Sequence, residues 1–341
     1  MFQAVYRSAR TITVSEANPA EPGPGQVRID VAYTGICGTD LHIYHGDMDS
    51  RVGAPAVIGH EMSGRIAALG PGAGGWAVGD PVTVMPLDWC GTCAACRAGN
   101  SHVCQNLTFI GIDAPGAMQQ SWVVPARTLV ALPAGLPLAQ AAVVEPTAVA
   151  VHDVGRAAVA AGEKVLVVGG GPVGTLIALV ARQVGAYVVI AELDAFRRDF
   201  AISLGLEAID PAATDVSAFV DTWTRGAGVP VTFEVSGAAA GLGAAVECLG
   251  VRGRLCLVAI HPRPRGVNLH RFFWRELHLV GARLYDRSDF QCAVELVAAG
   301  TVRADKFVTT VEPLSRTAAA FEALESGSGQ MKILIDCTQA G

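Results

Sequence analysis

A run of glycines between an apolar strand and an apolar helix is the feature that most constrains the fold. The segment KVLVVGGGPVGTLIALV, residues 164–180, carries G-x-G-x-x-G at Gly169, Gly171 and Gly174, and its helix is expected to begin near Pro172. Such glycines let the backbone turn tightly and approach a pyrophosphate at the positive end of the helix. No G-K-[ST] follows, which excludes a P-loop. The pattern predicts a dinucleotide site, with an ordinary glycine-rich turn as the alternative.

Strand-like and helix-like segments alternate from Gly162 onward, which is typical of a parallel, doubly wound α/β sheet. Residues 1 to about 130 instead contain short β-like stretches between Gly/Pro clusters such as EPGPGQ, as in a small barrel or sandwich. A chain of 341 residues has room for two domains. We therefore expect an α/β protein in which a β-rich domain precedes the parallel sheet.

The strand YVVIAE ends at Glu192, about where an acid meets the ribose hydroxyls of a bound dinucleotide. A carboxylate there repels a 2′-phosphate, which favours NAD over NADP, whereas Arg197 and Arg198 lie close enough in sequence to accept such a phosphate. NAD is therefore the expected cofactor.

Four cysteines lie in one short loop, CGTCAACRAGNSHVC, with the spacing C-x₂-C-x₂-C-x₇-C: Cys90, Cys93, Cys96 and Cys104. Four thiolates can close a tetrahedral shell around zinc and leave no open position, so structural zinc is expected. An iron–sulfur cluster is the rival, but the common bacterial run ends C-x₃-C-P. Four other cysteines lie in apolar runs and are expected to fill the core: Cys248, Cys256, Cys292 and Cys337.

A second group of metal-binding residue types is split between two segments. GICGTDLHIYHG contains Cys37, and VIGHEMSG contains His60 and Glu61. One thiolate, one imidazole and one carboxylate make an open zinc site with a fourth position for water or a substrate oxygen. The spacing alone does not decide, because a buried thiol, a core histidine and an ion-pairing glutamate would give the same pattern.

The composition excludes other classes of protein. With 25 basic and 31 acidic residues, a net charge of −6 and no basic stripe, we expect neither nucleic acid nor a membrane as a partner. Proline and glycine break the apolar runs before they could span a bilayer, and the first residues lack the apolar core of a secretory signal. We expect a cytoplasmic protein, in which clustered cysteines serve as metal ligands or catalytic groups.

Five motifs, in this order, resemble the zinc-dependent medium-chain alcohol dehydrogenases: GxCGTDLH, GHEMSG, the four-cysteine loop, EPTAVAVH and GGGPVG. The resemblance covers nearly the whole chain. Within that family, the chain resembles the branch of sorbitol (polyol), butanediol and threonine dehydrogenases, in which a glutamate follows the histidine. It implies a GroES-like catalytic domain at residues 1–147, rejoined by residues 290–341, and a Rossmann NAD-binding domain at residues 148–289.

The resemblance implies a zinc-dependent oxidoreductase that moves a hydride between NAD and a secondary alcohol of a small polyol, vicinal diol or sugar acid. It also implies a homo-oligomer, either a tetramer or a dimer. A threonine-type dehydrogenase and a noncatalytic protein that binds NAD and zinc are the alternatives. A zinc-free reductase of the same fold is disfavoured, because such relatives generally lack both cysteine clusters.

Roles for individual residues follow from the resemblance as well. Cys37, His60 and Glu61 would hold the catalytic zinc, with Glu145 beside it as an alternative or transient ligand. A second set would bind the cofactor: Gly169, Gly171, Pro172, Val173, Gly174, Glu192, Arg197, Val258, Ile260, Ala282 and Arg283.

The family also implies a proton relay in which Thr39 accepts the proton released on oxidation and His42 passes it to water. Sorbitol-type relatives carry an Arg-Tyr pair where this chain has Leu284 before Tyr285, so sorbitol is a doubtful substrate. Arg283 and Arg287 are candidate partners for a substrate carboxylate, with a solvated Arg287 favoured. Candidates for the pocket lining are His45, Trp89, Phe109, Trp122 and Trp274.

Overall fold

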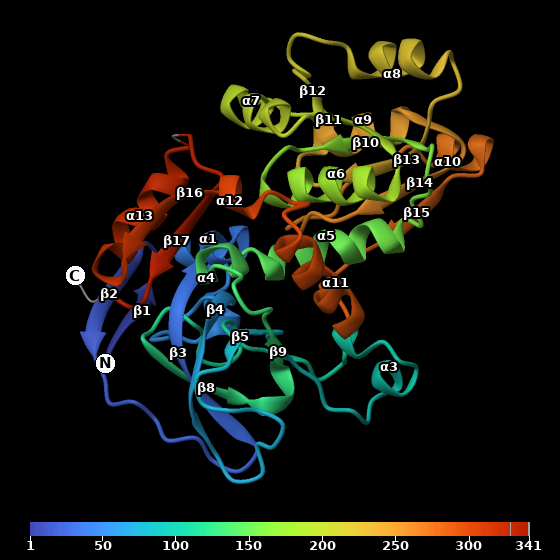
Figure 1. Ribbon diagram of the computed structural model, residues 1–341. Helices are drawn as coiled ribbons and strands as arrows, with labels where there is room; N and C mark the ends of the chain where they lie inside the picture. Colours follow the sequence, from blue (N-terminus) through green and yellow to red (C-terminus); the bar gives the residue numbers. More distant parts are fainter. Residues whose placement is uncertain (328, 340–341) are drawn as a thin grey trace. The chain divides into compact units, whose positions relative to one another are not determined.

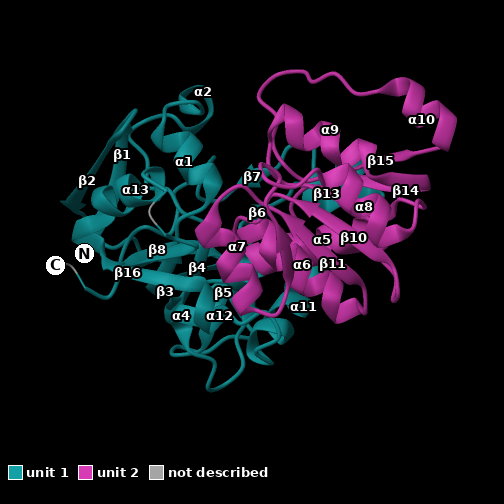
Figure 2. Cartoon of the chain, turned by 90° about the horizontal axis from the view of Figure 1, so that it is seen from above, with its two compact units in different colours: residues 1–145, 286–341 teal, residues 146–285 magenta. Residues whose placement is uncertain are grey.

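The structure is a computed structural model that describes residues 1–327 and 329–339. It divides into two compact units (Figure 2): residues 1–145 with 286–341, and residues 146–285. The domain boundaries expected from the sequence, after residues 147 and 289, fall close to these limits. Among the described residues, no helix is long and apolar enough to cross a membrane.

The first unit is built on a seven-stranded sheet with the order β16-β17-β3-β4-β5-β9, in which β8 also pairs with β3. Strand β3 (Gln26–Gly35) is antiparallel to β4 (Glu61–Leu69) and to β17 (Lys332–Asp336). Val27 and Ile29 are fully buried and alternate with polar residues along β3, because successive side chains of a strand point to opposite faces. The C-terminal strand β17 therefore completes a sheet begun by the N-terminal segment.

The other strands and helices of this unit surround that sheet or extend it (Figure 1). Its remaining strands are β1 (Phe2–Ser8), β2 (Thr11–Glu16), β5 (Pro81–Val84), β6 (Leu87–Asp88), β7 (Thr108–Phe109), β8 (Ser121–Pro125), β9 (Leu129–Ala131) and β16 (Val308–Pro313). Its helices are α1 (Gly38–Tyr44), α2 (Asp49–Val52), α3 (Ala94–Arg97), α4 (Leu138–Ala141), α11 (Arg287–Ala298), α12 (Ala304–Phe307) and α13 (Thr317–Glu325).

The second unit holds a parallel sheet of six strands in the order β12-β11-β10-β13-β14-β15. In chain order these are β10 (Lys164–Val168), β11 (Tyr187–Ala191), β12 (Glu207–Ile209), β13 (Val229–Glu234), β14 (Leu249–Leu257) and β15 (His278–Gly281). The connecting helices are α6 (Pro172–Val184), α7 (Ala195–Ser203), α8 (Val216–Thr224), α9 (Ala239–Glu247) and α10 (Leu269–Arg275), and α5 (Val144–Arg156) precedes β10.

The strand order reverses between β10 and β13, and ligands of doubly wound sheets bind at such a point, outside the carboxyl ends of the strands. Helix α6 begins there with Pro172 in its first turn and is capped at its C-terminus by Gly185, whose φ of 100° suits a glycine. Leu166, Val229 and Leu255 are fully buried in the core against this sheet. The predicted α/β class, a β-rich domain followed by a doubly wound parallel sheet, is confirmed.

Candidate active site

Cys37, His60 and Glu61 come together where β3 gives way to α1 and where β4 begins. Cys37 is the N-cap residue of α1, and Glu61 lies opposite Gly35 across the β3–β4 pair. One ligand atom from each of the three residues lies within 4.8 Å of the others. A Cβ at Gly35 would lie 2.2 Å from the Glu61 carboxylate, so only glycine leaves room for that group. The thiolate, imidazole and carboxylate suit zinc with one open position.

Asp40 completes the surroundings of His60, and the sequence prediction missed it. Its Oδ2 accepts the backbone N–H of Cys37 at 2.9 Å, and its Oδ1 lies 3.6 Å from Nδ1 of His60. Both Oδ1 and Nδ1 are buried and lack a hydrogen-bond partner within the described residues. A histidine that binds zinc through Nε2 normally donates its other N–H to a carboxylate, so this pair fits a metal on the far side of the ring.

The charges around the group favour a cation. Burial alone lowers the pKa of His60, but the charge of Asp40 and the hydrogen bond to Cys37 outweigh it and hold this pKa well above its usual value. Burial raises the pKa of Asp40, and the proximity of His60 opposes that rise. An environment that stabilises positive charge on a buried imidazole also stabilises a bound metal ion.

Lys332 of β17 is the second residue that sequence reasoning missed. Its Nζ donates to Oε2 of Glu61 at 2.7 Å, to Oε1 at 2.9 Å and to the carbonyl of Ile36 at 3.0 Å. Burial alone lowers the pKa of Lys332, but Glu61 and then Cys37 outweigh it, so the ammonium stays charged. The Glu61 carboxylate is therefore held by an ion pair while it lies within reach of a metal.

Glu145 lies in the first turn of α5 and is buried. Its charge contributes to the raised pKa of both His60 and Lys332, although burial and closer groups affect those two side chains more. Glu145 therefore faces the same group. Two carboxylates, Glu61 and Glu145, thus lie near one thiolate and one imidazole, and both oxygens of Glu61 contact Lys332.

Thr39 and His42 lie three residues apart on α1, which places them on neighbouring parts of one helix face. Thr39 is half-buried, and His42 is exposed, with Nδ1 3.4 Å from Oδ2 of Asp47. His45, a candidate for the pocket lining, instead has Nε2 2.7 Å from Oε1 of Glu325 on α13.

The four cysteines of the loop converge as the spacing predicts. Their sulfur atoms lie 3.5 Å apart for Cys93 and Cys96, 3.8 Å for Cys93 and Cys104, and 3.5 Å for Cys90 and Cys104. Zinc–sulfur bonds of about 2.3 Å in a tetrahedron place the sulfurs at about this separation. Hydrogen bonds from Thr92 lower the pKa of Cys90 to about 5, which favours the thiolate that binds metal. The group therefore fits a closed structural zinc site.

The remaining cysteines follow the expectation with one correction. Cys248, Cys256 and Cys337 are buried, as core residues should be. Cys292 is only half-buried on α11, because its position on the helix lies beside the buried stripe of Phe290, Ala293, Val294 and Val297 rather than within it.

The glycine run adopts the geometry that its spacing predicts. A Cβ on Gly174 would lie 1.9 Å from the carbonyl oxygen of Gly169, and Gly169 itself has a φ of 106°. Oε2 of Glu192 accepts the N–H of Gly170 at 2.5 Å, and Oε1 accepts the N–H of Asp194 at 2.8 Å. The acid that follows β11 is thus hydrogen-bonded to the glycine turn.

The two arginines after Glu192 differ in their surroundings. Arg197 has Nη1 3.7 Å from the position of a Cβ on Gly171, so it lies over the glycine turn. Arg198 donates to the carbonyls of Glu192 and Leu193 and pairs with Asp210 at 3.1 Å. Arg197 is therefore the arginine beside the expected pyrophosphate position.

The other predicted cofactor residues follow the carboxyl ends of β14 and β15. Val258 donates its N–H to the carbonyl of Glu234, and Ala282 donates to that of Leu257. Ile260 and Arg283 are exposed.

Two expectations about the substrate side need correction. Arg287 is half-buried rather than free in solvent, and its guanidinium donates to the backbone carbonyls of Arg127 and Leu129. Trp122 is a core residue, 2% exposed, and its indole N–H donates to the carbonyl of Pro115. Trp274 is exposed on α10 of the second unit, and its place in the pocket stays a prediction. Phe109, by contrast, packs edge-on against the His60 ring, with centroids 5.1 Å apart.

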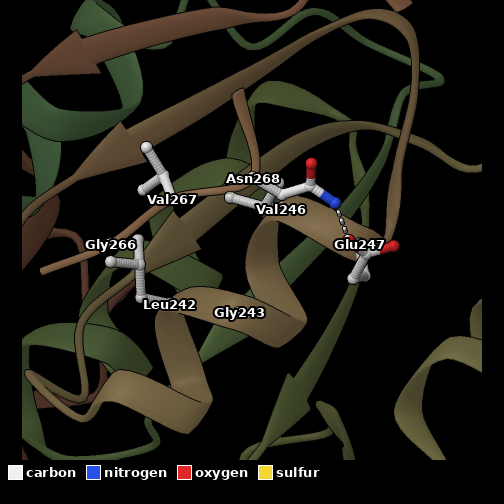
Figure 3. Close-up of a pocket in the computed structure, with 7 residues that line it drawn as sticks. All are labelled: Leu242, Gly243, Val246, Glu247, Gly266, Val267 and Asn268. Carbon is white, nitrogen blue, oxygen red and sulfur yellow. Dashed lines mark hydrogen bonds between the residues drawn. The ribbon is translucent and has the colours of Figure 1, made fainter. Parts of the chain in front are cut away.

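A small hollow in the second unit lies between α9 and residues 266–268 (Figure 3). Its only charged side chain, Glu247, accepts a hydrogen bond from Asn268 at 3.3 Å. None of the predicted metal or cofactor residues lines it, so we assign it no role in the chemistry.

Comparison with known proteins agrees with these sites. The chain matches an alcohol dehydrogenase GroES-like domain over residues 23–134 and a zinc-binding dehydrogenase domain over residues 172–299. It is 49% identical over 337 residues to 2-dehydro-3-deoxy-L-galactonate 5-dehydrogenase of Pseudoalteromonas atlantica, with 99% of each chain covered. It is 35% identical to L-threonine 3-dehydrogenase of Pyrococcus abyssi over 321 residues, 92% of this chain and 91% of that one.

A structure described as a short chain alcohol dehydrogenase from Escherichia coli CFT073, solved with NADH, superposes with a TM-score of 0.91 at 27% identity. The match covers 98% of this chain and 99% of that one. Together with the two metal groups and the glycine run, these matches show that the chain belongs to the zinc-dependent medium-chain alcohol dehydrogenase family, oxidoreductases that use NAD(P).

Proposed function

We propose that the chain oxidises a secondary hydroxyl of a six-carbon sugar acid, with NAD as the hydride acceptor. The observation that carries the proposal is the convergence of the half-buried Cys37 with the buried His60 and Glu61, in a chain 49% identical to a sugar-acid dehydrogenase. L-Threonine is the second candidate, because a threonine dehydrogenase is 35% identical over most of the chain.

Cys37, His60 and Glu61 would hold the catalytic zinc, with Glu145 beside them. When bound, zinc supplies a Lewis acid for the substrate hydroxyl, and NAD supplies the hydride acceptor. The chain itself orients the ligands: Asp40 fixes the ring of His60, and Lys332 fixes the carboxylate of Glu61.

Oxidation of an alcohol also releases a proton, and Thr39 and His42 form the route we propose for it. The Thr39 hydroxyl accepts the proton while it passes its own toward His42. The exposed imidazole of His42 then releases a proton to water, with Asp47 holding the ring in place.

In the second unit, Gly169, Gly171, Val173 and Gly174 would present backbone to the pyrophosphate, and Arg197 would add its positive charge. Glu192 favours NAD over NADP, because its carboxylate would repel a 2′-phosphate. Arg198 does not offset this preference, since its guanidinium is engaged by Asp210 and two carbonyls.

The more distant contacts of Val258, Ile260, Ala282 and Arg283 with the nicotinamide half of the cofactor are part of the same proposal. A homo-oligomer, tetramer or dimer, and a cytoplasmic location remain predictions from the family resemblance.

The test is NADH formation, followed by absorbance, with L-galactonate, 2-dehydro-3-deoxy-L-galactonate, galactitol, butane-2,3-diol and L-threonine. We expect the highest kcat/KM with a sugar acid and loss of that turnover when a strong zinc chelator is added. If L-threonine is the only compound of the panel that is oxidised, the proposed substrate class, a sugar acid, is wrong and L-threonine takes its place. Silence of the whole panel, with NADH still bound, would favour a noncatalytic binding protein.

A further inference from the structure

The loop that carries Phe109 is fixed against the segment that leads into His60. Gly116 donates its N–H to the carbonyl of Val57 at 2.7 Å, and Ala117 donates to that of Gly59 at 2.9 Å. The loop also packs tightly there, because a Cβ on Gly116 would lie only 2.5 Å from the carbonyl oxygen of Gly59. The edge-on contact of Phe109 with the His60 ring is thus rigidly supported.

Asp113 lies in the same loop, and its carboxylate contacts both the backbone of Phe109 and the guanidinium of Arg51. Oδ2 of Asp113 accepts the backbone N–H of Phe109 at 2.8 Å. The same carboxylate accepts from Nε of Arg51 at 2.7 Å and from Nη2 at 2.8 Å. Arg51 belongs to α2, in the stretch of chain between Cys37 and His60. The ion pair therefore joins the two segments that flank His60.

The guanidinium of Arg51 keeps hydrogen-bond donors for a second acid. Asp113 takes Nε–H and one N–H of Nη2, and within residues 1–327 and 329–339 the guanidinium donates to no other group. Its Nη1/Nη2 edge has the fork geometry that binds a carboxylate through two parallel hydrogen bonds. The Arg51 side chain is 41% exposed, so solute can reach it. The hydrogen bond to Asp113 raises the pKa of Arg51, so the charge persists.

Two other cations of the first unit, Lys332 and Arg287, are already committed to partners. Lys332 gives its ammonium to Glu61 and to the carbonyl of Ile36. Arg287, a candidate from the sequence, donates to the backbone carbonyls of Arg127 and Leu129. Each would have to break buried or part-buried hydrogen bonds before it could bind a new acid, whereas Arg51 would not.

We propose that Arg51, held in place by Asp113, binds the carboxylate of the substrate and so selects sugar acids over neutral polyols. The inference rests on the proposed sugar-acid function. A carboxylate bound away from the reacting carbon positions the hydroxyl at the metal group, and its binding energy serves orientation as well as affinity. Asp113 acts as a positioning residue, because it touches Arg51 and not the substrate.

The experiment compares Arg51→Gln with wild type on L-galactonate and on L-galactonamide, which has the same hydroxyls without the charge. Arg303→Gln is the matched control. Arg303 makes the same side-on contact with Asp305, with Nε to Oδ1 at 3.0 Å and Nη2 to Oδ2 at 2.9 Å, and is similarly exposed at 44%. The Kd for NADH is measured in all three proteins to report whether each is intact.

We expect Arg51→Gln to raise the KM for L-galactonate on the order of 10- to 100-fold, because a charge-assisted, two-point contact is lost. Its kcat/KM for L-galactonamide and its Kd for NADH should stay within about twofold of wild type. Arg303→Gln should leave the KM for L-galactonate and the kcat/KM for L-galactonamide unchanged. Asp113→Asn should give a smaller rise in the KM for the acid, since Arg51 keeps its charge but loses its fixed orientation.

An unchanged KM for L-galactonate in Arg51→Gln would overturn the inference while leaving the proposed function intact. An equal loss with the acid and the amide would also overturn it, because the effect would then be structural. If wild type oxidises no sugar acid at all, the proposed function itself fails, and the role of Arg51 fails with it.

Discussion

The two metal groups of the first unit are built in opposite ways. The four-cysteine group lies in one loop, residues 90–104, and its sulfurs accept hydrogen bonds from N–H groups of the same loop and of Asn106. Cys37, His60 and Glu61 come from the ends of β3 and β4, and Lys332 reaches them from β17. The closed group is therefore a local structure, whereas the open group exists only when distant segments form one sheet.

Lys332→Met should have the largest effect, and it should remove zinc from the open group while the four-cysteine group keeps its own. Glu61 would keep its buried charge and lose the ammonium that contacts both oxygens, and removing one partner of a buried pair costs about 3–5 kcal/mol. We expect reduced thermal stability, loss of zinc from the open group and no turnover, with the four-cysteine group still loaded. Metal analysis and thermal unfolding measure this. Lys332→Arg, which keeps the charge, should recover part of both properties; wild-type behaviour of Lys332→Met would remove the ion pair from the account.

Cys93→Ser should have the converse effect. The closed shell loses a thiolate, so we expect about one zinc fewer per chain and a loss of about 2 kcal/mol or more in the free energy of unfolding. The Kd for NADH should stay near the wild-type value, because the glycine run belongs to the other unit. Cys292→Ser, at a half-buried cysteine outside both groups, is the control. Equal zinc content in Cys93→Ser and wild type would contradict a metal site in the loop.

Asp40→Asn tests the open group without changing its shape. The amide has no negative charge to place beside His60, whose Nδ1 lies 3.6 Å from Oδ1 of Asp40, so zinc should bind this group about 10- to 100-fold more weakly. Competition with a chelator of known affinity measures the zinc affinity of each variant. Asp30→Asn, at an exposed position of β3, should leave zinc affinity unchanged. An equally small effect of both variants would show that Asp40 only caps α1.

His42→Gln should give the smallest effect. His42 is exposed, so water can take over much of its proton transfer, and we expect kcat to fall about tenfold or less. Imidazole added to the assay should restore part of the rate. A wild-type kcat at every pH tested would leave Thr39 to pass its proton directly to water.

The contrast between the groups also explains what the sequence could predict. The four cysteines are close in sequence, so their spacing alone predicts a tetrahedral site. Cys37, His60 and Glu61 follow from their motifs and from the family resemblance. Asp40 carried a signal that sequence reasoning overlooked, an acid three residues after the N-cap Cys37. Lys332 carried none, because its partner Glu61 lies 271 residues earlier in the chain.

The corrections of Arg287 and Trp122 share one physical cause. Arg287 was expected in solvent and Trp122 in a pocket because residue types have typical exposures. The structure gives Arg287 two backbone carbonyls and gives Trp122 a place in the core with its N–H bonded. Such contacts depend on tertiary neighbours, which periodicity and spacing do not specify. The alternation of strands and helices, in contrast, was sufficient to predict the parallel sheet.

The most direct test of the account is the zinc content and sugar-acid turnover of Cys37→Ser, measured on the same sample. Cys37 belongs to the open group and not to the four-cysteine group. We therefore expect about one zinc fewer per chain and no detectable NADH formation, with an unchanged Kd for NADH and a folded protein. Turnover of L-galactonate at the wild-type rate in this variant would contradict catalysis at the group of Cys37, His60 and Glu61.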